Sequence, residues 1–366
     1  MIKDRSKNQD IRITIVLPSL DRRISPIKGA LLLANFLHQE GFTISLLSLK
    51  SNQDKDLKEN FPFREETLNI KSFFEFFIAR KRIIRHLSSM KIDLVITFTI
   101  LPDLLVSTIK SIKKISFIRG YLIDQYKQDF PIFSHFVTTL HFKALKRFHY
   151  LIAMTPSMRS EIISLGVQPE NVIINKNSID VIAIRDSISD YPISEDHSIN
   201  IAIAGSLTKR KQVSDAIKAI SKIDHPIVLN IFGSGPEYNN LVHLAERLNI
   251  SDKIIFHGYV DNLAMNFINM DIILSTSMSE GVSRALIEAM SLGKTVIASD
   301  IPGSLDLIQH SKTGFIYRKG DCNHLAKTIN EVLSQNKFID SKYLMEYMER
   351  HHDYRSCYKE LVQKIL

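Results

Sequence analysis

The sequence predicts an α/β protein built on two doubly wound parallel sheets. Apolar runs of strand length alternate with segments whose apolar residues recur at helical spacing, as at 12–18, 31–39 and 42–49. Strand, helix and strand in that order form the βαβ unit with which a parallel sheet begins. The alternation starts again after a polar stretch at 186–198, and 366 residues suffice for two domains of roughly 150 residues.

This alternation also gives the expected domain boundaries. Residues 1–190 form an N-terminal Rossmann-like domain and residues 191–344 a second one, with the polar stretch at 186–198 as the linker. Strands of the first domain are expected at 12–18, 42–49, 93–98, 114–120, 150–155 and 171–175. Strands of the second are expected at 199–204, 227–232, 254–260, 272–274 and 294–300, with a hairpin-like edge at 312–317 and helices at 325–333 and 341–366.

The composition is typical of a globular protein in a reducing compartment. Hydrophobic residues make up 45% of the chain and charged residues 23%. The two cysteines, Cys322 and Cys357, have no regular spacing, so neither a disulfide framework nor a zinc site is expected. Residues 1–10 are polar, and Pro102 and Asp103 interrupt the apolar stretch 94–109, so no signal peptide or membrane span is expected. These features favour a cytoplasmic protein.

The positive charge is concentrated in the first half of the chain. Residues 1–190 hold 28 Lys and Arg against 19 Asp and Glu, whereas residues 191–366 hold 19 against 20, so the net charges are +9 and −1. A basic half favours a phosphate-bearing partner, such as nucleic acid, anionic lipid or a pyrophosphate. The chain lacks recognisable nucleic-acid readout motifs, and no nucleic-acid partner is expected.

Two glutamates, Glu280 and Glu288, bracket the predicted start of a helix. The apolar run 272–274 ends before Glu280, and Glu288 lies about 9 Å along the following helix at roughly 1.5 Å per residue. Between them the N–H groups of Gly281, Val282 and Ser283 form an anion site at the positive end of the helix dipole, and Ser283 is placed to cap the first turn. Carboxylates that accept from sugar hydroxyls, with amides that hold phosphates, match a nucleoside diphosphate sugar.

This stretch resembles family 4 of the retaining glycosyltransferases, the glycosyl transferases group 1. The resemblance rests on Glu280-Gly281, the seven residues between the glutamates, Glu288-Ala289-Met290, Gly293, and the later Asp300-Ile301-Pro302-Gly303. It implies the GT-B arrangement, in which two Rossmann-like domains face each other across the reaction cleft. It also implies that the second domain holds the donor, that the first holds the acceptor, and that a C-terminal helix at about 345–366 packs back on the first domain. Retention of configuration without a metal or other cofactor is implied as well.

Further donor-binding residues are implied in the loops that follow the strands of the second domain. Lys211 matches a lysine that grips the diphosphate in the resembled family, whereas Ser206 replaces an arginine, for which Lys209 and Arg210 could substitute. Gly205 and Gly233 lie in the two glycine-containing turns at 205–211 and 233–237. His257 and Tyr259 end a strand that flanks the nucleotide base in the family, and His257 is equally consistent with a packing role.

Two residues of the first domain carry the resemblance more loosely. Gly29 is the remaining member of a glycine pair that faces the diphosphate in the family, here expected in a loop before a helix at 31–39. Arg119 stands near the position of a family histidine. It either offers a fixed cation to a phosphate or acid, or is a structural residue at the end of a strand.

Three charged segments leave their roles open. The segment 73–87 combines a stripe of Phe, Ile and Leu with a basic cluster, and fits either an anionic membrane surface or a core-packed helix. The basic patch at 141–147 leaves the same choice. Asp54 and Asp56 have the spacing of a metal-binding pair, but their charge-rich surroundings favour a solvated loop.

Taken together, these features predict a hexosyltransferase. It would move a sugar from a nucleoside diphosphate sugar to a saccharide acceptor, with Glu280 positioning the donor sugar, Glu288 holding the ribose and Lys211 neutralising the leaving diphosphate. The basic half favours a lipid-linked acceptor in cell-surface polysaccharide synthesis (capsule, O-antigen or lipopolysaccharide), with peripheral contact to the inner face of the cytoplasmic membrane. A nucleotide-sugar epimerase of the same fold and a non-catalytic binding protein stay as alternatives, and the donor nucleotide stays open.

Overall fold

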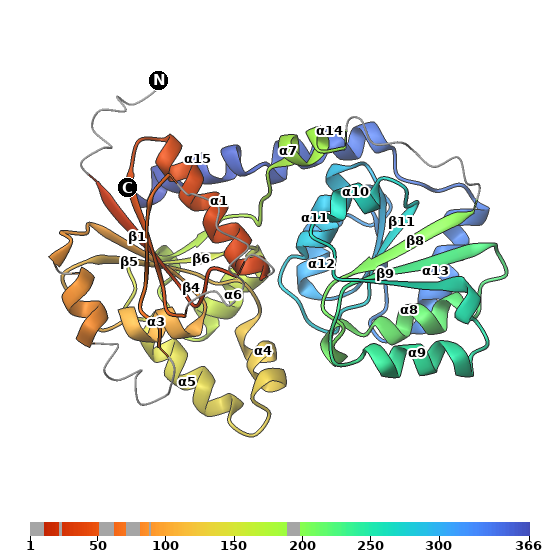
Figure 1. Cartoon of the computed structure of the whole chain (residues 1–366), viewed down its shortest axis with the longest axis horizontal. Coiled ribbons are helices and arrows are strands. Elements are labelled where there is room, and N and C mark those ends of the chain that lie inside the picture. The colour runs from red at the N-terminus through yellow and green to blue at the C-terminus, as the bar shows by residue number, and fades with distance from the viewer. Residues whose placement is uncertain (1–10, 22–23, 51–61, 71–80, 88, 189–197) are drawn as a thin grey trace. The chain divides into compact units, whose positions relative to one another are not determined.

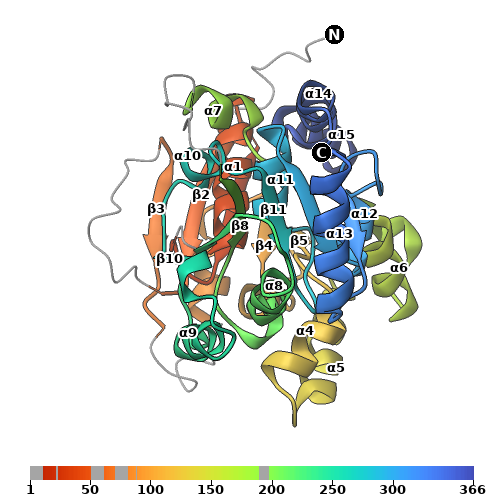
Figure 2. The same cartoon turned by 90° about the vertical axis from the view of Figure 1, so that its right-hand side faces the viewer.

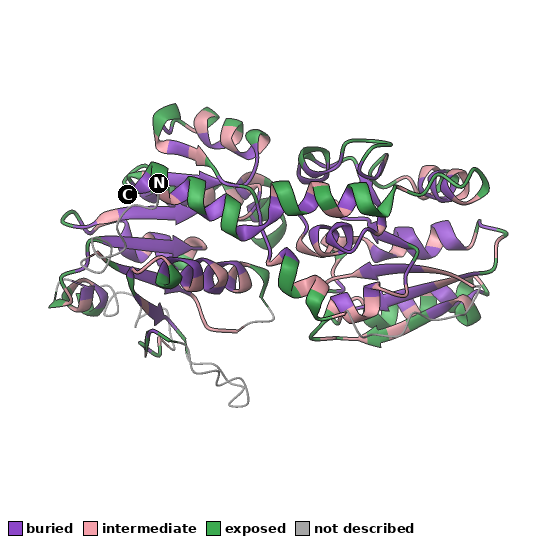
Figure 3. Ribbon diagram, turned by 90° about the horizontal axis from the view of Figure 1, so that it is seen from above, coloured by how far each residue is buried: buried purple, intermediate pink, exposed green. Residues whose placement is uncertain are grey.

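The computed structural model describes residues 11–21, 24–50, 62–70, 81–87, 89–188 and 198–366. The chain divides into two compact units, one comprising Met1–Lys176 and Cys357–Leu366 and the other Asn177–Ser356. Each unit contains one parallel β-sheet with helices packed around it (Figure 1). Seen from above, the buried strands lie between helices whose outer sides are exposed (Figure 3). The predicted α/β class, with two Rossmann-like sheets, is therefore confirmed.

The first unit has a seven-stranded sheet in the order β3-β2-β1-β4-β5-β6-β7, and every pairing between these strands is parallel. Its strands are β1 (Arg12–Leu17), β2 (Thr43–Ser48), β3 (Arg64–Thr67), β4 (Leu94–Phe98), β5 (Lys113–Phe117), β6 (Tyr150–Ala153) and β7 (Val172–Ile174). Its helices are α1 (Ser25–Gln39), α3 (Ile100–Val106), α4 (Leu122–Asp129), α5 (Ser134–Leu145), α6 (Pro156–Ser164) and most of α15 (Tyr354–Ile365).

The second unit has a six-stranded sheet in the order β10-β9-β8-β11-β12-β13, again with parallel pairing throughout. Its strands are β8 (Ile199–Ala204), β9 (Ile227–Phe232), β10 (Ile254–Gly258), β11 (Ile272–Ser275), β12 (Thr295–Ser299) and β13 (Phe315–Tyr317). Its helices are α7 (Val181–Asp186), α8 (Val213–Ile220), α9 (Tyr238–Arg247), α10 (Leu263–Phe267), α11 (Arg284–Ser291), α12 (Pro302–Leu307), α13 (Cys322–Ser334) and α14 (Ser341–His352).

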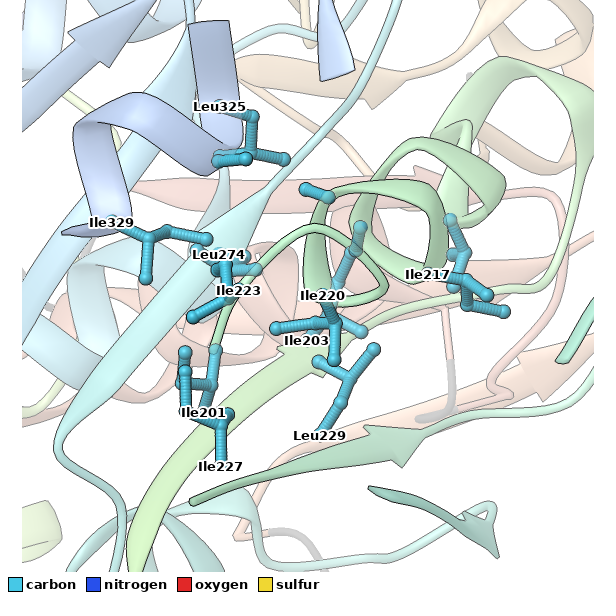
Figure 4. Close-up of a cluster of buried hydrophobic side chains, with 14 of the residues drawn as sticks. Ile201, Ile203, Ile217, Ile220, Ile223, Ile227, Leu229, Leu274, Leu325 and Ile329 are labelled. Atoms are coloured by element: carbon cyan, nitrogen blue, oxygen red, sulfur yellow. The ribbon is translucent and has the colours of Figure 1, made fainter. Parts of the chain in front are cut away.

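The core of the second unit explains why its loops are held firmly. Isoleucine and leucine side chains from β8, β9 and β11 pack against α8 and α13, as the close-up in Figure 4 shows. Ile201, Ile217, Ile220, Leu229 and Ile329 have no measurable exposure. Full burial of one such side chain stabilises the fold by about 1.5–3 kcal/mol. A rigid sheet of this kind fixes the loops that leave its carboxyl edge.

Each sheet has one point at which the chain changes its winding direction. In the first unit this point lies between β1 and β4, and in the second it lies between β8 and β11. The loops that leave two such neighbouring strands diverge onto opposite faces of the sheet, which opens a crevice at the carboxyl edge. The loops after β8 and β11 are therefore the first place to look for a site in the second unit.

Three local expectations are wrong in detail. The segment 312–317 was expected to form a hairpin-like edge, but β13 joins β12 in a parallel register because α12 carries the chain back across the sheet. Gly29 lies inside α1 and not in a loop. The helix begins six residues before the expected position, because Pro26 in its first turn favours helix initiation there. Ser283 occupies the N-cap position of α11, but its side chain makes no capping hydrogen bond.

Some of the charged segments whose roles the sequence left open lie only partly within the described residues. Residues 81–87 are helical, with Ile83 and Leu87 buried and Arg82 and Arg85 exposed, which is the pattern of a core-packed helix with a basic outer face. The rest of 73–87 and the pair Asp54 and Asp56 fall outside the described residues. None of the helices in the described part of the chain combines the length and apolar composition that a bilayer crossing needs.

Candidate active site

The loop after β8 brings Lys211 to the carboxyl edge of the second sheet. Residues 209–211 form one 3₁₀ turn, and Gln212 then adopts a left-handed conformation with φ of 49° before α8 begins. The side chain of Lys211 passes beside Gly205, where an added Cβ would lie 3.2 Å from its Cε. A small pocket is lined by Gly205, Lys211, Phe232 and residues 275–277. Lys211 is thus one wall of a recess at the winding-reversal point.

The glycine turn after β9 packs directly against this loop. Gly233 has φ of +139°, and a Cβ there would lie 1.9 Å from the carbonyl oxygen of Gly205. No side chain can occupy that space without moving backbone. The Gly233 N–H also donates to the Gly258 carbonyl at 2.6 Å, which ties the ends of β9 and β10 together. Both predicted glycines, Gly205 and Gly233, therefore lie in one tightly packed corner.

Glu280 meets Lys211 across the winding-reversal point. Its Oε1 accepts from Lys211 Nζ at 2.6 Å, and its Oε2 accepts from Ser277 Oγ at 2.9 Å. The two loops are tied together further, because Thr276 Oγ1 donates to the Lys211 carbonyl and Arg210 Nη1 donates to the Ser279 carbonyl. The side chains of Lys211 and Glu280 are 15% and 18% exposed, so the pair is largely buried but still reached by solvent.

The surroundings of Glu280 keep it ionised. Burial alone would raise the pKa of this carboxyl. The charge and hydrogen bond of Lys211, the charge of Arg210 and the hydrogen bond from Ser277 outweigh burial and hold the pKa below its ordinary value. Glu280 is therefore a carboxylate at neutral pH. Both its oxygens already accept a hydrogen bond, which makes them poor nucleophiles. Their remaining lone pairs can still accept further hydrogen bonds.

The N-terminal end of α11 lies beside this carboxylate. Among the described residues, none accepts a hydrogen bond from the N–H groups of Gly281, Val282 or Ser283. The loop is supported from behind, since Asn177 Nδ2 donates to the Val282 carbonyl at 3.0 Å. Gly303 closes it from the other side, where a Cβ would lie 1.7 Å from the Gly281 carbonyl oxygen. Ser283 is the N-cap of α11, and Gly281 and Val282 lie in the loop just before it, so these three N–H groups are available to an anion beside the positive end of the helix.

Glu288 lies on the first turns of α11 and is paired with Arg284. Arg284 Nε lies 3.1 Å from Glu288 Oε1, and the two side chains are 16% and 13% exposed. Arg284 Nη1 is buried and has no hydrogen-bond partner among the described residues. The sequence predicted a role for Glu288 but missed Arg284, although the four-residue spacing between them is the signal for such a helix pair. Ser277, the second support of Glu280, was missed because a serine before a turn has no distinctive pattern.

His257 lies at the end of β10, stacked on Phe232. The two rings are 4.3 Å apart with an angle of 12°, and His257 Nε2 lies 2.8 Å from Asn230 Oδ1. Partial burial lowers the pKa of His257, so the ring is neutral at pH 7. Tyr259, one residue past the strand, is 46% exposed. His257 thus has the packing role that the sequence left open. His257 and Tyr259 are both exposed, so part of each ring stays accessible.

Gly29 and Arg119 come together within the first unit. An added Cβ at Gly29 would lie 3.0 Å from Arg119 Nη2, so the guanidinium lies directly over the glycine. The Gly29 carbonyl accepts from Tyr358 Oη at 3.2 Å, which ties α1 to α15. Arg119 follows β5 at the carboxyl edge of the first sheet, where ligands of such sheets bind. Ser206, by contrast, lies in the second unit and is exposed beside Gly205.

The fold of two Rossmann-like units in one chain is that of the GT-B proteins. Residues 186–350 match the family model described as glycosyl transferases group 1. The match covers most of the second unit, and Lys211, Glu280 and Glu288 lie within it.

Individual relatives and solved structures agree with this result. The chain is 32% identical to N-acetyl-alpha-D-glucosaminyl L-malate synthase of Bacillus anthracis over 150 residues, 40% of this chain and 39% of the relative. It is 24% identical to lipopolysaccharide 1,6-galactosyltransferase of Escherichia coli (strain K12) over 250 residues, 65% of this chain and 68% of the relative. The matched stretch thus spans about two fifths of the first relative and about two thirds of the second. The structure of Anabaena Alr3699/HepE in complex with UDP superposes with a TM-score of 0.81 at 16% identity, covering 96% of this chain and 99% of that one.

Proposed function

We propose that the protein is a retaining glycosyltransferase of the family 4 type, which transfers a hexose from a nucleoside diphosphate sugar to a hydroxyl of a saccharide acceptor. The observation that carries the proposal is the Lys211–Glu280 pair at the winding-reversal point between β8 and β11, 2.6 Å apart beside a bare helix end. The group 1 domain match covers this site. HepE, which shares the fold, has been solved with UDP and with UDP-glucose, which supports a nucleotide sugar as donor.

The proposed roles follow from what each group can still bind. Lys211 donates one of its three N–H groups to Glu280, so two remain for the diphosphate. The N–H groups of Gly281, Val282 and Ser283 add uncharged donors at the positive end of α11. As the bond between the anomeric carbon and the diphosphate oxygen breaks, these groups stabilise the charge that develops on the leaving diphosphate. No metal ion is assigned to this step.

The two carboxylates bind hydroxyl groups. Glu280 is held ionised and accepts hydrogen bonds from the hydroxyls of the donor sugar, which orients the anomeric carbon. Glu288 keeps Oε2 for the ribose hydroxyls, since Arg284 occupies Oε1. His257 and Tyr259 offer ring surfaces to the nucleotide base. The acceptor oxygen then forms the new bond on the face that the diphosphate leaves, and its proton passes to the departing diphosphate oxygen.

The acceptor is proposed to be a lipid-linked saccharide at the inner face of the cytoplasmic membrane. The relatives include a lipopolysaccharide 1,6-galactosyltransferase and an O-antigen biosynthesis glycosyltransferase, which favours a cell-surface polysaccharide. The basic first half of the chain suits an acceptor that carries pyrophosphate. Peripheral contact with an anionic membrane follows from such an acceptor.

Calorimetry with UDP, GDP, ADP and CDP tests the donor site directly. One nucleoside diphosphate should bind with a Kd below about 1 mM, and Glu288→Ala should weaken it by roughly 10-fold through the ribose. Lys312→Ala, which removes an exposed lysine outside the site, is the control and should leave binding unchanged. Absence of binding by all four nucleotides, with no hydrolysis or transfer from their hexose esters, would remove the proposal.

A further inference from the structure

Helices α4 and α5 form a hairpin that projects from the body of the first unit. The hairpin is drawn in yellow in Figure 1 and lies at the lower edge of Figure 2. Helix α4 ends at Asp129, α5 begins at Ser134, and four residues connect them. The function proposed above uses no residue of this hairpin.

The tip of the hairpin exposes an unusual amount of apolar surface. Of the sixteen large hydrophobic residues that are exposed in the described part of the chain, five fall within eleven consecutive positions. They are Phe130, Ile132, Phe133, Phe136 and Leu140, which are 42%, 89%, 65%, 66% and 43% exposed. With about 200 Å² for a whole side chain, these fractions amount to roughly 600 Å². A patch of that size is at the upper end of what monomers leave uncovered and marks an interaction surface.

Helical spacing places most of this surface on one side of α5. Phe133, Phe136, Leu140, Lys143 and Arg147 follow one another at intervals of three and four residues, so they form one stripe. We call this stripe, with Phe130 and Ile132, the hairpin tip. The stripe is apolar at the tip and ends in two exposed cations nearer the sheet. Apolar side chains with cations behind them have the order of a peptide that enters a membrane surface.

The hairpin is held firmly to its own unit, so its exposed face does not result from loose packing. On the inner face of α5, His141 Nε2 lies 2.8 Å from Asp103 Oδ2, and His141 Nδ1 lies 2.6 Å from Tyr126 Oη. Thr97 on β4 donates to the other oxygen of Asp103. All four side chains are at most 3% exposed. This chain of buried hydrogen bonds links β4, α3, α4 and α5 and holds the tip outward.

Positive charge surrounds the hairpin tip. A pocket of about 470 Å³ beside α5 is lined by Lys127, Lys143, Lys146 and His135 among other residues. Asp124 and Asp129 are the two carboxylates of residues 119–150, against five Lys and Arg, so this segment has a net charge of +3. The first unit as a whole holds 29 Lys and Arg against 17 Asp and Glu, a net of +12, whereas the second holds 18 against 22, a net of −4.

We propose that the hairpin tip inserts into the surface of an anionic bilayer, with Phe133 and Phe136 among the acyl chains and Lys143 and Arg147 at the headgroups. The proposal rests on the proposed function only in that a lipid-linked acceptor needs the enzyme at a membrane. A second copy fits less well, because a twofold contact through this face would pair two segments that each carry a net charge of +3. An area of roughly 600 Å² is also below the 800 Å² per partner of an ordinary protein interface. The pocket lined by three lysines suits a lipid phosphate.

A single tryptophan tests the insertion, because the chain contains none. Phe133→Trp preserves the apolar tip, and its emission should shift to shorter wavelength when vesicles with 30% anionic lipid are added at low salt. Lipids brominated along the acyl chain should quench it. Phe338→Trp, at a residue of the second unit that is 40% exposed, is the control and should show neither effect. No shift at Phe133→Trp, or an equal shift at both positions, would overturn the proposal.

Removal of the apolar side chains gives the complementary measurement. Ile132→Ser with Phe136→Ser should lower the vesicle partition coefficient by at least about 10-fold. Transfer of either side chain from water to the acyl chains by itself favours vesicle binding by roughly that factor. Phe338→Ser with Tyr343→Ser removes the same number of exposed large side chains from the second unit and should change the partition coefficient less than twofold. Loss of a dimer in the first variant, with unchanged partitioning, would assign the tip to a second copy. Nucleotide calorimetry on the same variants uses no vesicles, so failure of the donor site is seen separately.

Discussion

Replacement of Lys211 by methionine removes the charge from the pair that organises the candidate site and keeps most of its volume. Removal of one partner from a fully buried ion pair costs about 3–5 kcal/mol, because the other charge is left without compensation. Here the two side chains are 15% and 18% exposed, and Glu280 keeps its hydrogen bond from Ser277. We therefore expect Lys211→Met to destabilise the second unit by about 1–3 kcal/mol.

The destabilisation should depend on pH in a definite direction. In the wild type the pKa of Glu280 lies below its ordinary value of 4.5, so the carboxylate stabilises the fold above that pH and its contribution is lost as pH falls through the folded pKa. In Lys211→Met burial acts with less opposition and raises the pKa, so the ionised carboxylate becomes unfavourable at neutral pH. The difference between the two proteins should be largest near pH 7 and should shrink as pH falls through the raised pKa of the variant and then through the lowered pKa of the wild type.

Urea unfolding of the second unit supplies the measurement. Because the chain has no tryptophan, Phe338→Trp can serve as the background in which the emission of this unit alone is followed. Glu280→Gln and the double variant complete a cycle, in which a pair 2.6 Å apart should show a coupling free energy of about 1–3 kcal/mol. A loss of stability that is the same at pH 7 and pH 4, or a coupling below about 0.3 kcal/mol, would show that the pair does not act as described.

Three further variants probe the rest of the site. Arg284→Ala leaves Glu288 without its partner and should weaken nucleotide binding by roughly 10-fold, as measured by calorimetry. Gly233→Ala places a Cβ 1.9 Å from the Gly205 carbonyl oxygen and should destabilise the second unit by at least about 2 kcal/mol in urea. Ser206→Arg restores a cation beside the proposed diphosphate site and should tighten binding by roughly 3- to 10-fold, an effect that salt weakens.

Matched controls separate these effects from general damage. Arg247→Ala removes an exposed arginine of α9 and should leave binding unchanged. Gly320→Ala tests backbone strain alone, since this glycine has φ of +76° with nothing within 4 Å of its Cβ position, and should cost about 1 kcal/mol. Ser187→Arg adds the same charge outside the loops after β8, β9 and β11. Equal tightening by Ser187→Arg and Ser206→Arg would mean that net charge, not position, is responsible.

The fold class could be predicted from the sequence because strands of a doubly wound sheet are buried on both faces. Strands such as Ile272–Ser275 and Thr295–Ser299 are therefore almost continuous apolar runs with clear ends. The glutamate motif could be located for a related reason, since it lies between such a strand and an amphipathic helix. Local pattern and tertiary position agree there, which is the condition under which sequence reasoning succeeds.

The parts that could not be predicted depend on contacts between distant segments. Arg284 lies four residues before Glu288, but this spacing alone did not identify it as the partner of that glutamate. The hydrogen bond from Ser277 to Glu280 depends on the conformation of the turn between them, which no sequence pattern indicated. The α4–α5 hairpin was missed because α5 carries apolar residues on both its inner and outer faces, as Phe142 and Phe136 show, so it lacks the one-sided period of an ordinary surface helix. The parallel pairing of β13 depends on the path of α12.

The Lys211–Glu280 pair implies that binding of the sugar and of the diphosphate are linked. Lys211, 2.6 Å away, is the main group that holds this partly buried carboxylate ionised, with Arg210 and Ser277 in support, and the same ammonium group keeps two donors for phosphate. One lysine would thus serve the sugar through Glu280 and the diphosphate directly. Loss of Lys211 should then weaken the intact donor more than the free nucleoside diphosphate, whereas loss of Glu288 should weaken both equally. If Lys211→Met weakens binding of the donor and of the free nucleoside diphosphate equally, the sugar is oriented without this pair.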